Sequence, residues 1–208
     1  MARRRPASRA GRTGRRISVF LDAVELARGH DGFLRGKPEP ALVFAAWSVG
    51  RSSARLLGRA LRRLAVQGPF PCIALPQDAE LLRAASSFDH DRVALLAAAL
   101  EVDDGTDLGR IYAALGDQQA VSVWFDDAPA PDPHPIADAA RLLDPARAPG
   151  PVRLLRDRAD VEDSCRGDQW VGASLLVRPI GAGATEERLR VASRDQRNDW
   201  TACLRLRT

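Results

Sequence analysis

The sequence predicts a mainly β fold, an antiparallel β-sandwich with short helical insertions. Apolar and β-branched residues gather in short runs, which are typical of strands rather than of long helices. Turn-forming glycine, proline and aspartate residues separate these runs. The length also allows a single domain, because a chain of 208 residues can remove about 70% of its unfolded surface from water.

The first elements are two strands joined by a long loop. Ile17–Leu26 begins with β-branched and aromatic residues, which favour a strand. Residues 27–40 contain three glycines and two prolines and are expected to form a loop, after which Ala41–Trp47 is typical of a buried strand. In Ser53–Val66 the leucines fall on one helical face with most arginines opposite. This spacing favours an amphipathic helix, and an irregular strand stays open as the alternative.

The middle of the chain mixes extended and helical signals. Phe70–Leu75 lies among prolines and is expected to be extended, and Asp78–Ala85 is expected to form a short helix behind an aspartate cap. Val93–Val102 is apolar enough to be buried as either a strand or a helix. Thr106–Leu115 starts at a cap residue and precedes Gly116, so it is expected to be a short helix.

The second half is expected to end in strands. Val121–Phe125 is a predicted strand, Asp126–Pro135 with its four prolines is a linker-like loop, and Ile136–Leu143 is expected to form a turn or two of helix. Four short apolar or alternating pieces follow, namely Val152–Leu155, Trp170–Val177, Arg188–Val191 and Thr201–Leu206. The tryptophans lie at or beside predicted strands and are expected in the core or at its rim: Trp47, Trp124, Trp170 and Trp200.

The charge distribution divides the chain into an arm, residues 1–16, and one sandwich domain, residues 17–208. The arm holds seven of the 31 basic residues and no acidic one, which leaves 24 basic against 27 acidic residues and a net charge of −3 in the domain. Large apolar residues are almost absent from the arm, so it is expected to be disordered. Its arginines are Arg3, Arg4, Arg5, Arg9, Arg12, Arg15 and Arg16.

The arm is expected to bind polyanions, either nucleic acid or an anionic membrane surface. No aromatic residue interleaves its arginines, so contact with nucleic acid would be to phosphate only. A merely solubilising tail and an organellar transit peptide stay open as alternatives. Asp22 and Glu25 interrupt the apolar run behind Arg15 and Arg16, which argues against an export signal.

No motif predicts an enzyme, a catalytic residue or a small-molecule substrate. His90 and Asp91 resemble the dyad of a metal-dependent phosphohydrolase, but the further ligands that such a site needs are missing, so a solvated turn is the preferred interpretation. The three cysteines, Cys72, Cys165 and Cys203, are widely spaced and predict neither disulfides nor a zinc site. Such cysteine usage fits a reducing cytoplasm, including the cytoplasmic face of a membrane.

Acidic residues gather in three predicted loops. Asp31 and Glu39 share the first, Asp103 and Asp107 the second, and Asp168 ends the third. Calcium needs six to eight oxygen ligands, which flexible loops can supply, so calcium is the cofactor that these residues suggest. The alternative is that aspartate simply favours turns.

Three patches resemble C2 domains. Ile17–Trp47 contains Asp31-Gly-Phe and Pro38-Glu39-Pro40 where that family has its first calcium-binding loop. Leu100–Gly109 and Gly167–Gly172 are similar to its later strand, acidic loop and Asp-hydrophobe-Gly return. Glu39 replaces the usual aspartate, and the full Asp-x-Asp pair is absent. The resemblance implies a β-sandwich whose loops carry calcium.

Two functions follow from these patterns. The first is a non-catalytic C2-like module in which calcium, held by Asp31, Glu39, Asp103, Asp107 and Asp168, bridges to anionic phospholipid while the arm adds a second electrostatic contact. The second is a structural protein whose sandwich associates with itself or with protein partners, the arm holding nucleic acid or a neighbouring subunit.

Overall fold

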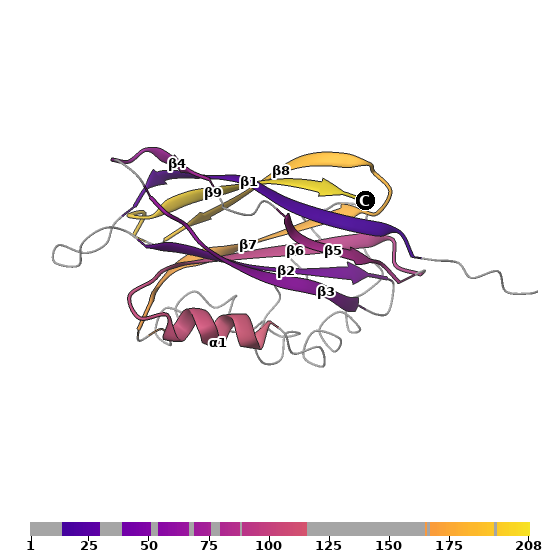
Figure 1. Cartoon of the computed structure of the whole chain (residues 1–208), viewed down its shortest axis with the longest axis horizontal. Helices are drawn as coiled ribbons and strands as arrows, with labels where there is room; N and C mark the ends of the chain where they lie inside the picture. The colour runs from indigo at the N-terminus through magenta and orange to yellow at the C-terminus, as the bar shows by residue number, and fades with distance from the viewer. Residues whose placement is uncertain are drawn as a thin grey trace, which may run out of the picture.

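The structure, a computed structural model, describes residues 14–29, 39–50, 54–66, 69–75, 80–87, 89–115, 165, 167–193 and 195–208. Within these residues two antiparallel sheets pack face to face, and a short helix lies against one of them (Figure 1). Some predicted elements fall outside the described residues, namely Val121–Phe125, Asp126–Pro135, Ile136–Leu143 and Val152–Leu155, together with Trp124.

After β1, the described strands come along the chain in pairs, and successive pairs belong to different sheets. In order they are β1 (Arg16–Arg28), β2 (Pro40–Val49), β3 (Ala54–Arg63), β4 (Cys72–Ala74), β5 (Glu80–Ala85), β6 (Arg92–Glu101), α1 (Thr106–Ala114), β7 (Gln169–Pro179), β8 (Ala184–Ala192) and β9 (Asp199–Arg207).

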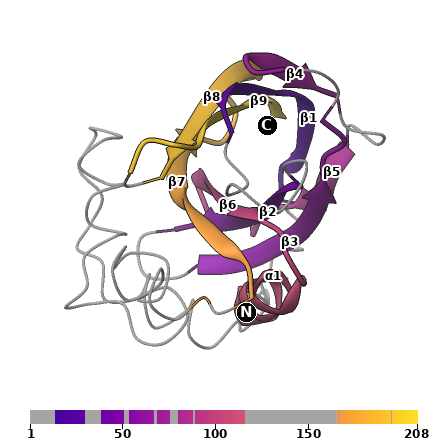
Figure 2. The same ribbon diagram turned by 90° about the vertical axis from the view of Figure 1, so that its left-hand side faces the viewer.

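Sheet A has the strand order β4-β1-β9-β8, with β5 also paired to β1, and sheet B has the order β3-β2-β6-β7. Every ladder is antiparallel. Viewed along the molecule, the two sheets curve around a shared interior (Figure 2). The prediction of a mainly β antiparallel sandwich with a short helix is therefore confirmed.

Alternating side chains of sheet A fill the interior between the sheets. In β1 the buried residues Ile17, Val19 and Leu21 point inward, and a register shift between Leu21 and Ala23 keeps Val24 on the same face. The strand interval that the sequence predicted for Ile17–Leu26 is confirmed. Such alternation is expected for a strand with one face in the core and one face toward solvent.

The two central strands of sheet B, β2 and β6, are buried on both faces, unlike the strands of sheet A. All of β2 except Val49 is buried, and β6 is buried from Val93 to Glu101. The outward side chains of these strands form a second apolar cluster with α1, in which Leu108 and Ile111 pack above the sheet. This second layer explains why Ala41–Trp47 and Val93–Val102 read as continuous apolar runs instead of alternating ones.

Two segments with helical signals in the sequence contain strands in the structure. Asp78–Ala85 was expected to be a helix, and this is wrong, because Glu80–Ala85 is strand β5 paired with Arg16–Phe20 of β1. Pairing with a strand about 60 residues away in sequence overrides the local cap signal. Ser53–Val66, left open between helix and strand, contains strand β3, whose register with β2 shifts between Ala46 and Trp47.

Both long sides of the sandwich are joined by specific contacts. On one side, Arg55 donates to the carbonyl of Ala85, and the Arg62 guanidinium donates to the carbonyl of Glu80 at 3.0 Å, which connects β3 to β5. On the other side, Arg178 of β7 forms two 2.8 Å hydrogen bonds with the Glu187 carboxylate of β8.

Candidate functional site

Four of the predicted calcium ligands lie at one end of sheet B. The register pairs Pro40 with Glu101, and Glu101 with Gln169, so the segments next to these residues meet. The Val102 N–H donates to the Glu39 carbonyl at 3.1 Å, which holds the two segments together. Glu39, Asp103, Asp107 and Asp168 are thus brought together, whereas Asp31 lies outside the described residues.

Asp168 is buried, and its carboxylate accepts four backbone hydrogen bonds. Oδ1 accepts from the N–H groups of Asp103, Asp104 and Gly105 at 3.0, 3.1 and 2.8 Å. Oδ2 accepts from the Leu108 N–H at 2.8 Å, in the first turn of α1. Burial alone would raise the pKa of Asp168, but the four donors outweigh it, so the pKa is lowered from its ordinary value.

Asp107 in turn accepts hydrogen bonds from the backbone at Asp168. Its Oδ2 accepts from the N–H groups of Gly167 and Asp168 at 2.8 and 3.1 Å, and its Oδ1 accepts from the Arg110 guanidinium at 2.9 Å. Each aspartate therefore binds the backbone next to the other. We call Asp107 and Asp168 the carboxylate clasp, because together they tie the start of α1 to the start of β7.

The clasp surrounds its negative charge with N–H donors. A calcium ion needs the same oxygen lone pairs, so binding there would have to displace these hydrogen bonds. Glu39 and Asp103 are exposed at the same end of the sheet. Among the described residues, no group of three or more histidine, cysteine, aspartate or glutamate side chains is placed to hold a metal ion. Calcium binding stays a prediction.

Four arginines on the outer face of sheet A are compensated by carboxylates. The Arg190 guanidinium forms two hydrogen bonds of 2.8 and 2.7 Å with Asp199, and the pKa of Asp199 is lowered chiefly for this reason. The remaining pairs also cross between strands: Arg28 with Asp199, Arg188 with Glu25, and Arg205 with Asp22. Arg207 of β9 is exposed and lies over the Phe20 ring at 5.3 Å instead, so four arginines of this face are compensated and Arg207 is not.

A second group of arginines lies on the side formed by β3 and β5. Five arginines follow this side, and we call them the basic edge: Arg55, Arg59, Arg62 and Arg63 of β3, and Arg83 of β5. The Arg59 guanidinium stacks over the Tyr112 ring at 4.2 Å and donates to the Ala113 carbonyl at 3.1 Å, so it caps the end of α1. Arg63 is exposed.

The basic edge lacks matching carboxylates. Glu80 is the acidic residue on strands β3, β4 and β5, and it pairs with Arg83 at 2.8 Å. In the part of the chain that the structure describes, Arg55, Arg59 and Arg63 form no ion pair. The bonds of Arg55 and Arg59 go to carbonyl oxygens, which leaves the positive charge of each guanidinium uncompensated.

The basic edge is continuous with the predicted arm. Arg16 pairs with Ala85, the residue whose carbonyl accepts from Arg55. The Arg15 N–H donates to Ser86 Oγ at 3.0 Å, and the Arg15 guanidinium donates to the Ile180 carbonyl at 2.6 Å. Arg15 and Arg16 thus belong to the sandwich, although they were predicted to be in the arm. Arg3, Arg4, Arg5, Arg9 and Arg12 lie outside the described residues.

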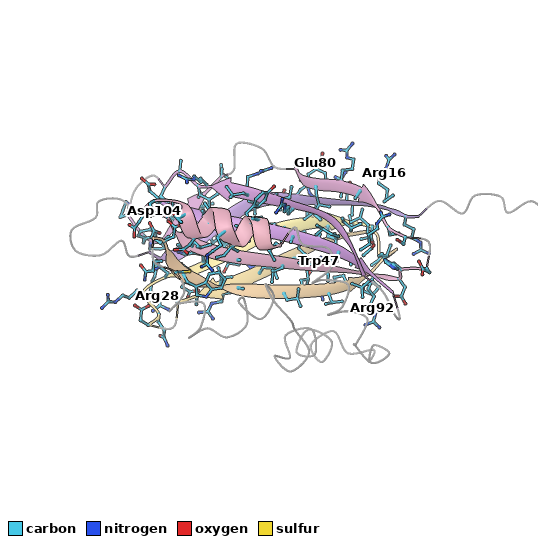
Figure 3. All side chains as sticks on the ribbon, turned by 90° about the horizontal axis from the view of Figure 1, so that it is seen from below. Arg16, Arg28, Trp47, Glu80, Arg92 and Asp104 are labelled. Atoms are coloured by element: carbon cyan, nitrogen blue, oxygen red, sulfur yellow. The ribbon has the colours of Figure 1, made fainter. Side chains whose placement is uncertain are left out.

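The acidic segments and the arm lie at opposite ends of the molecule. Asp104 lies beside the start of α1 at one end of the long axis, and Arg16 lies toward the other end, on the same side as Glu80 (Figure 3). At Arg16 the chain meets the basic edge near Arg55, whereas Arg63, at the other end of β3, lies against Gly105 beside Asp104.

The sequence did not single out the aliphatic pair at β4. Ile73 and Leu75 are the exposed large hydrophobic residues of the described chain, with 65% and 71% of their surfaces accessible. Ile73 lies on the outer face of sheet A, and Leu75 directly follows the last residue of β4, Ala74, which is buried in the interior. The alternation was visible in the sequence, but the edge position that leaves the pair uncovered was not.

His90 is not the solvated turn residue that was expected. It is buried, its Nδ1 lies 2.8 Å from the Ser48 hydroxyl, and a Cβ added to Gly50 would lie 2.8 Å from its ring. Asp91 next to it is exposed, and its N–H donates to the Val49 carbonyl at 3.2 Å. His90 thus packs the turn between β5 and β6 against the end of β2.

Comparisons with known proteins found no match to a family model, to a curated protein or to a solved structure. The resemblance to C2 domains therefore stays a prediction. Among the described residues, α1 is far too short to cross a bilayer, and no other helix is long and apolar enough to do so.

Proposed function

We propose that this protein is a non-catalytic docking module that binds an anionic membrane surface through the basic edge. The observation that carries the proposal is the contrast between the two groups of arginines. Arg28, Arg188, Arg190 and Arg205 of β1, β8 and β9 are paired with carboxylates, whereas Arg55, Arg59 and Arg63 are not. Uncompensated arginines on one edge favour a partner that supplies phosphate or carboxylate oxygens.

The surplus positive charge of the basic edge sets the expected strength of membrane binding. Five arginines against one glutamate leave a surplus of four positive charges on strands β3, β4 and β5. At about 1 kcal/mol for each basic residue near an anionic leaflet, the basic edge supplies about 4 kcal/mol. That corresponds to weak binding, so the arginines of the arm, which join the same edge at Arg16, are expected to strengthen it.

Calcium has a secondary place in this proposal. The sequence suggested that calcium would bridge the acidic loops to lipid, but Asp107 and Asp168 already use their oxygens on backbone N–H groups. The basic edge needs no cation to attract an anionic surface. We therefore expect binding that persists in a calcium chelator and falls as salt is added.

The test is sedimentation with vesicles of phosphatidylcholine alone or mixed with phosphatidylserine, over a salt series and with calcium or a chelator. R55E/R63E reverses two uncompensated charges and should weaken binding by about a thousandfold, since each reversal removes roughly 2 kcal/mol. The matched control is R197E, which changes an exposed arginine in the turn between β8 and β9 and should change binding little.

Three outcomes would count against the proposal. Equal binding of R55E/R63E and the natural chain would remove the basic edge from the explanation. Binding that requires calcium would favour the acidic loops instead. Retention on a polynucleotide, without any affinity for anionic vesicles, would favour the nucleic-acid role of the arm.

A further inference from the structure

The exposure of Ile73 and Leu75 is a consequence of where β4 lies in sheet A. The strand pairs with Val24–Leu26 of β1 and forms one edge of the sheet. Its inward residue, Ala74, takes part in the core, whereas Ile73 before it and Leu75 after it are exposed. No described residue covers them, whereas the other large apolar side chains of the described residues are buried or partly buried.

The aliphatic pair lies along the same side of the sandwich as the basic edge. β4 pairs with one end of β1, and β5 pairs with the other end, Arg16–Phe20, so the two short strands follow one another beside β1. β5 in turn is bonded to β3 through Arg55 and Arg62. Seen along the molecule, β4, β5 and β3 follow one side in succession (Figure 2).

The size of the apolar surface restricts its partner. A stable protein interface buries roughly 800 Å² on each side, which is far more than two aliphatic side chains can offer. A bilayer makes no such demand, since a shallow apolar anchor beside basic residues is enough for interfacial binding. The surplus positive charge on β3 and β5 also matches anionic headgroups.

We infer that Ile73 and Leu75 insert into the outer hydrocarbon boundary of an anionic bilayer, so that the side formed by β3, β5 and β4 lies on the membrane. This inference rests on the proposed function and names its partner as lipid. It places the contact on sheet A and its edge, since β4 pairs with Val24–Leu26 of β1, whereas Asp103 and Asp168 lie beside sheet B and α1 toward the same end of the long axis (Figure 3). The insertion proposed here uses Ile73 and Leu75 and assigns no role to calcium.

The first measurement compares the natural chain with I73S/L75S on vesicles of phosphatidylcholine and phosphatidylserine. The serine variant should lose at least tenfold in affinity, with the dependence on salt unchanged, because the arginines are intact. I73L/L75I keeps the apolar surface and should bind like the natural chain. Both residues are exposed, so all three proteins should melt at the same temperature.

The second measurement reports insertion directly. An I73W variant should be quenched by lipids brominated near the top of their acyl chains more strongly than the natural chain. Trp47, Trp170 and Trp200 are buried, and Trp124, outside the described residues, is common to both proteins, so the difference reports the indole that I73W introduces. Absence of extra quenching while the protein is bound would overturn insertion.

The outcomes separate the two proposals. If I73S/L75S binds as well as the natural chain, insertion fails but docking by the basic edge stands. If the natural chain does not bind anionic vesicles at all, both proposals fail. If the serine variant also loses polynucleotide binding, the aliphatic pair acts outside a bilayer and the inference is overturned.

Discussion

Replacing Asp168 with asparagine tests the carboxylate clasp at its centre. The amide keeps the shape of the side chain and can present its oxygen to the N–H groups of Asp103, Asp104 and Gly105. Its NH2 group must then face the Leu108 N–H, where Oδ2 now accepts a 2.8 Å hydrogen bond. A buried donor would oppose another donor, and the ionic character of the other three bonds would be lost.

The magnitude follows from those four bonds. Hydrogen bonds to charged groups contribute about 1.5–3 kcal/mol each, and a buried donor left without an acceptor costs about 1–3 kcal/mol. Because most of the donors are near solvent, we expect D168N to lower the free energy of unfolding by about 3 kcal/mol. In a domain of this size that lowers Tm by roughly 6–12 °C.

The assay is urea and thermal denaturation followed by circular dichroism, with D104N as control. Asp104 is exposed and accepts one backbone hydrogen bond, from Thr106 at 2.7 Å, so D104N should cost below about 1 kcal/mol. If D168N is no more destabilising than D104N, the clasp does not stabilise the fold and the reasoning is refuted.

The dependence of stability on pH provides a second test of the role of Asp168. The pKa of Asp168 is lowered in the folded protein, so its contribution is complete above the unfolded pKa of about 3.9. It is lost as the pH falls below that value toward the folded pKa. The stability difference between the natural chain and D168N should therefore shrink below about pH 4, and a difference that is constant from pH 7 to pH 3 would contradict the assignment.

Three further outcomes can be checked by urea denaturation. E187Q weakens the paired hydrogen bonds to Arg178 between β7 and β8 and should cost about 2 kcal/mol; no loss would mean that solvent screens the pair. G172V should cost about 1–3 kcal/mol, because a Cβ there lies 3.1 Å from the Ala192 carbonyl oxygen, and a neutral result would show that β8 can move away. F44A removes a fully buried ring and should cost about 3–5 kcal/mol; less than about 2 kcal/mol would mean that the core collapses around the gap.

The fold was predictable where local pattern and tertiary environment agree. Ile17–Leu26 alternates because one face of β1 is in the core, and Thr106–Leu115 has helix signals at both ends, so both elements were predicted correctly. β5 was missed because its strand character comes from pairing with Arg16–Phe20, which no local signal reports. In β3 the register shift opposite Ala46 breaks the alternation, and the leucines then fall at helical spacing.

The candidate site was predictable only in part. The meeting of Glu39, Asp103, Asp107 and Asp168 follows from neighbouring strands that end together, as the sequence suggested. That the buried aspartates accept backbone N–H groups depends on loop geometry, which composition does not reveal. The arginines of the basic edge were noticed as the polar face of a helix. Interpreted as an edge strand, the same residues would have indicated a basic surface.

The carboxylate clasp also joins two chain segments, at the start of α1 and the start of β7, that are about 60 residues apart in the sequence. Joining two distant chain segments has an entropic cost that grows only slowly with the length of the connection. Here, Asp107 and Asp168 join the two anchor points through hydrogen bonds between residues 103–108 and residues 167–168. The clasp is thus a non-covalent tie between these segments, and it limits how far α1 and β7 can separate while both sheets remain folded.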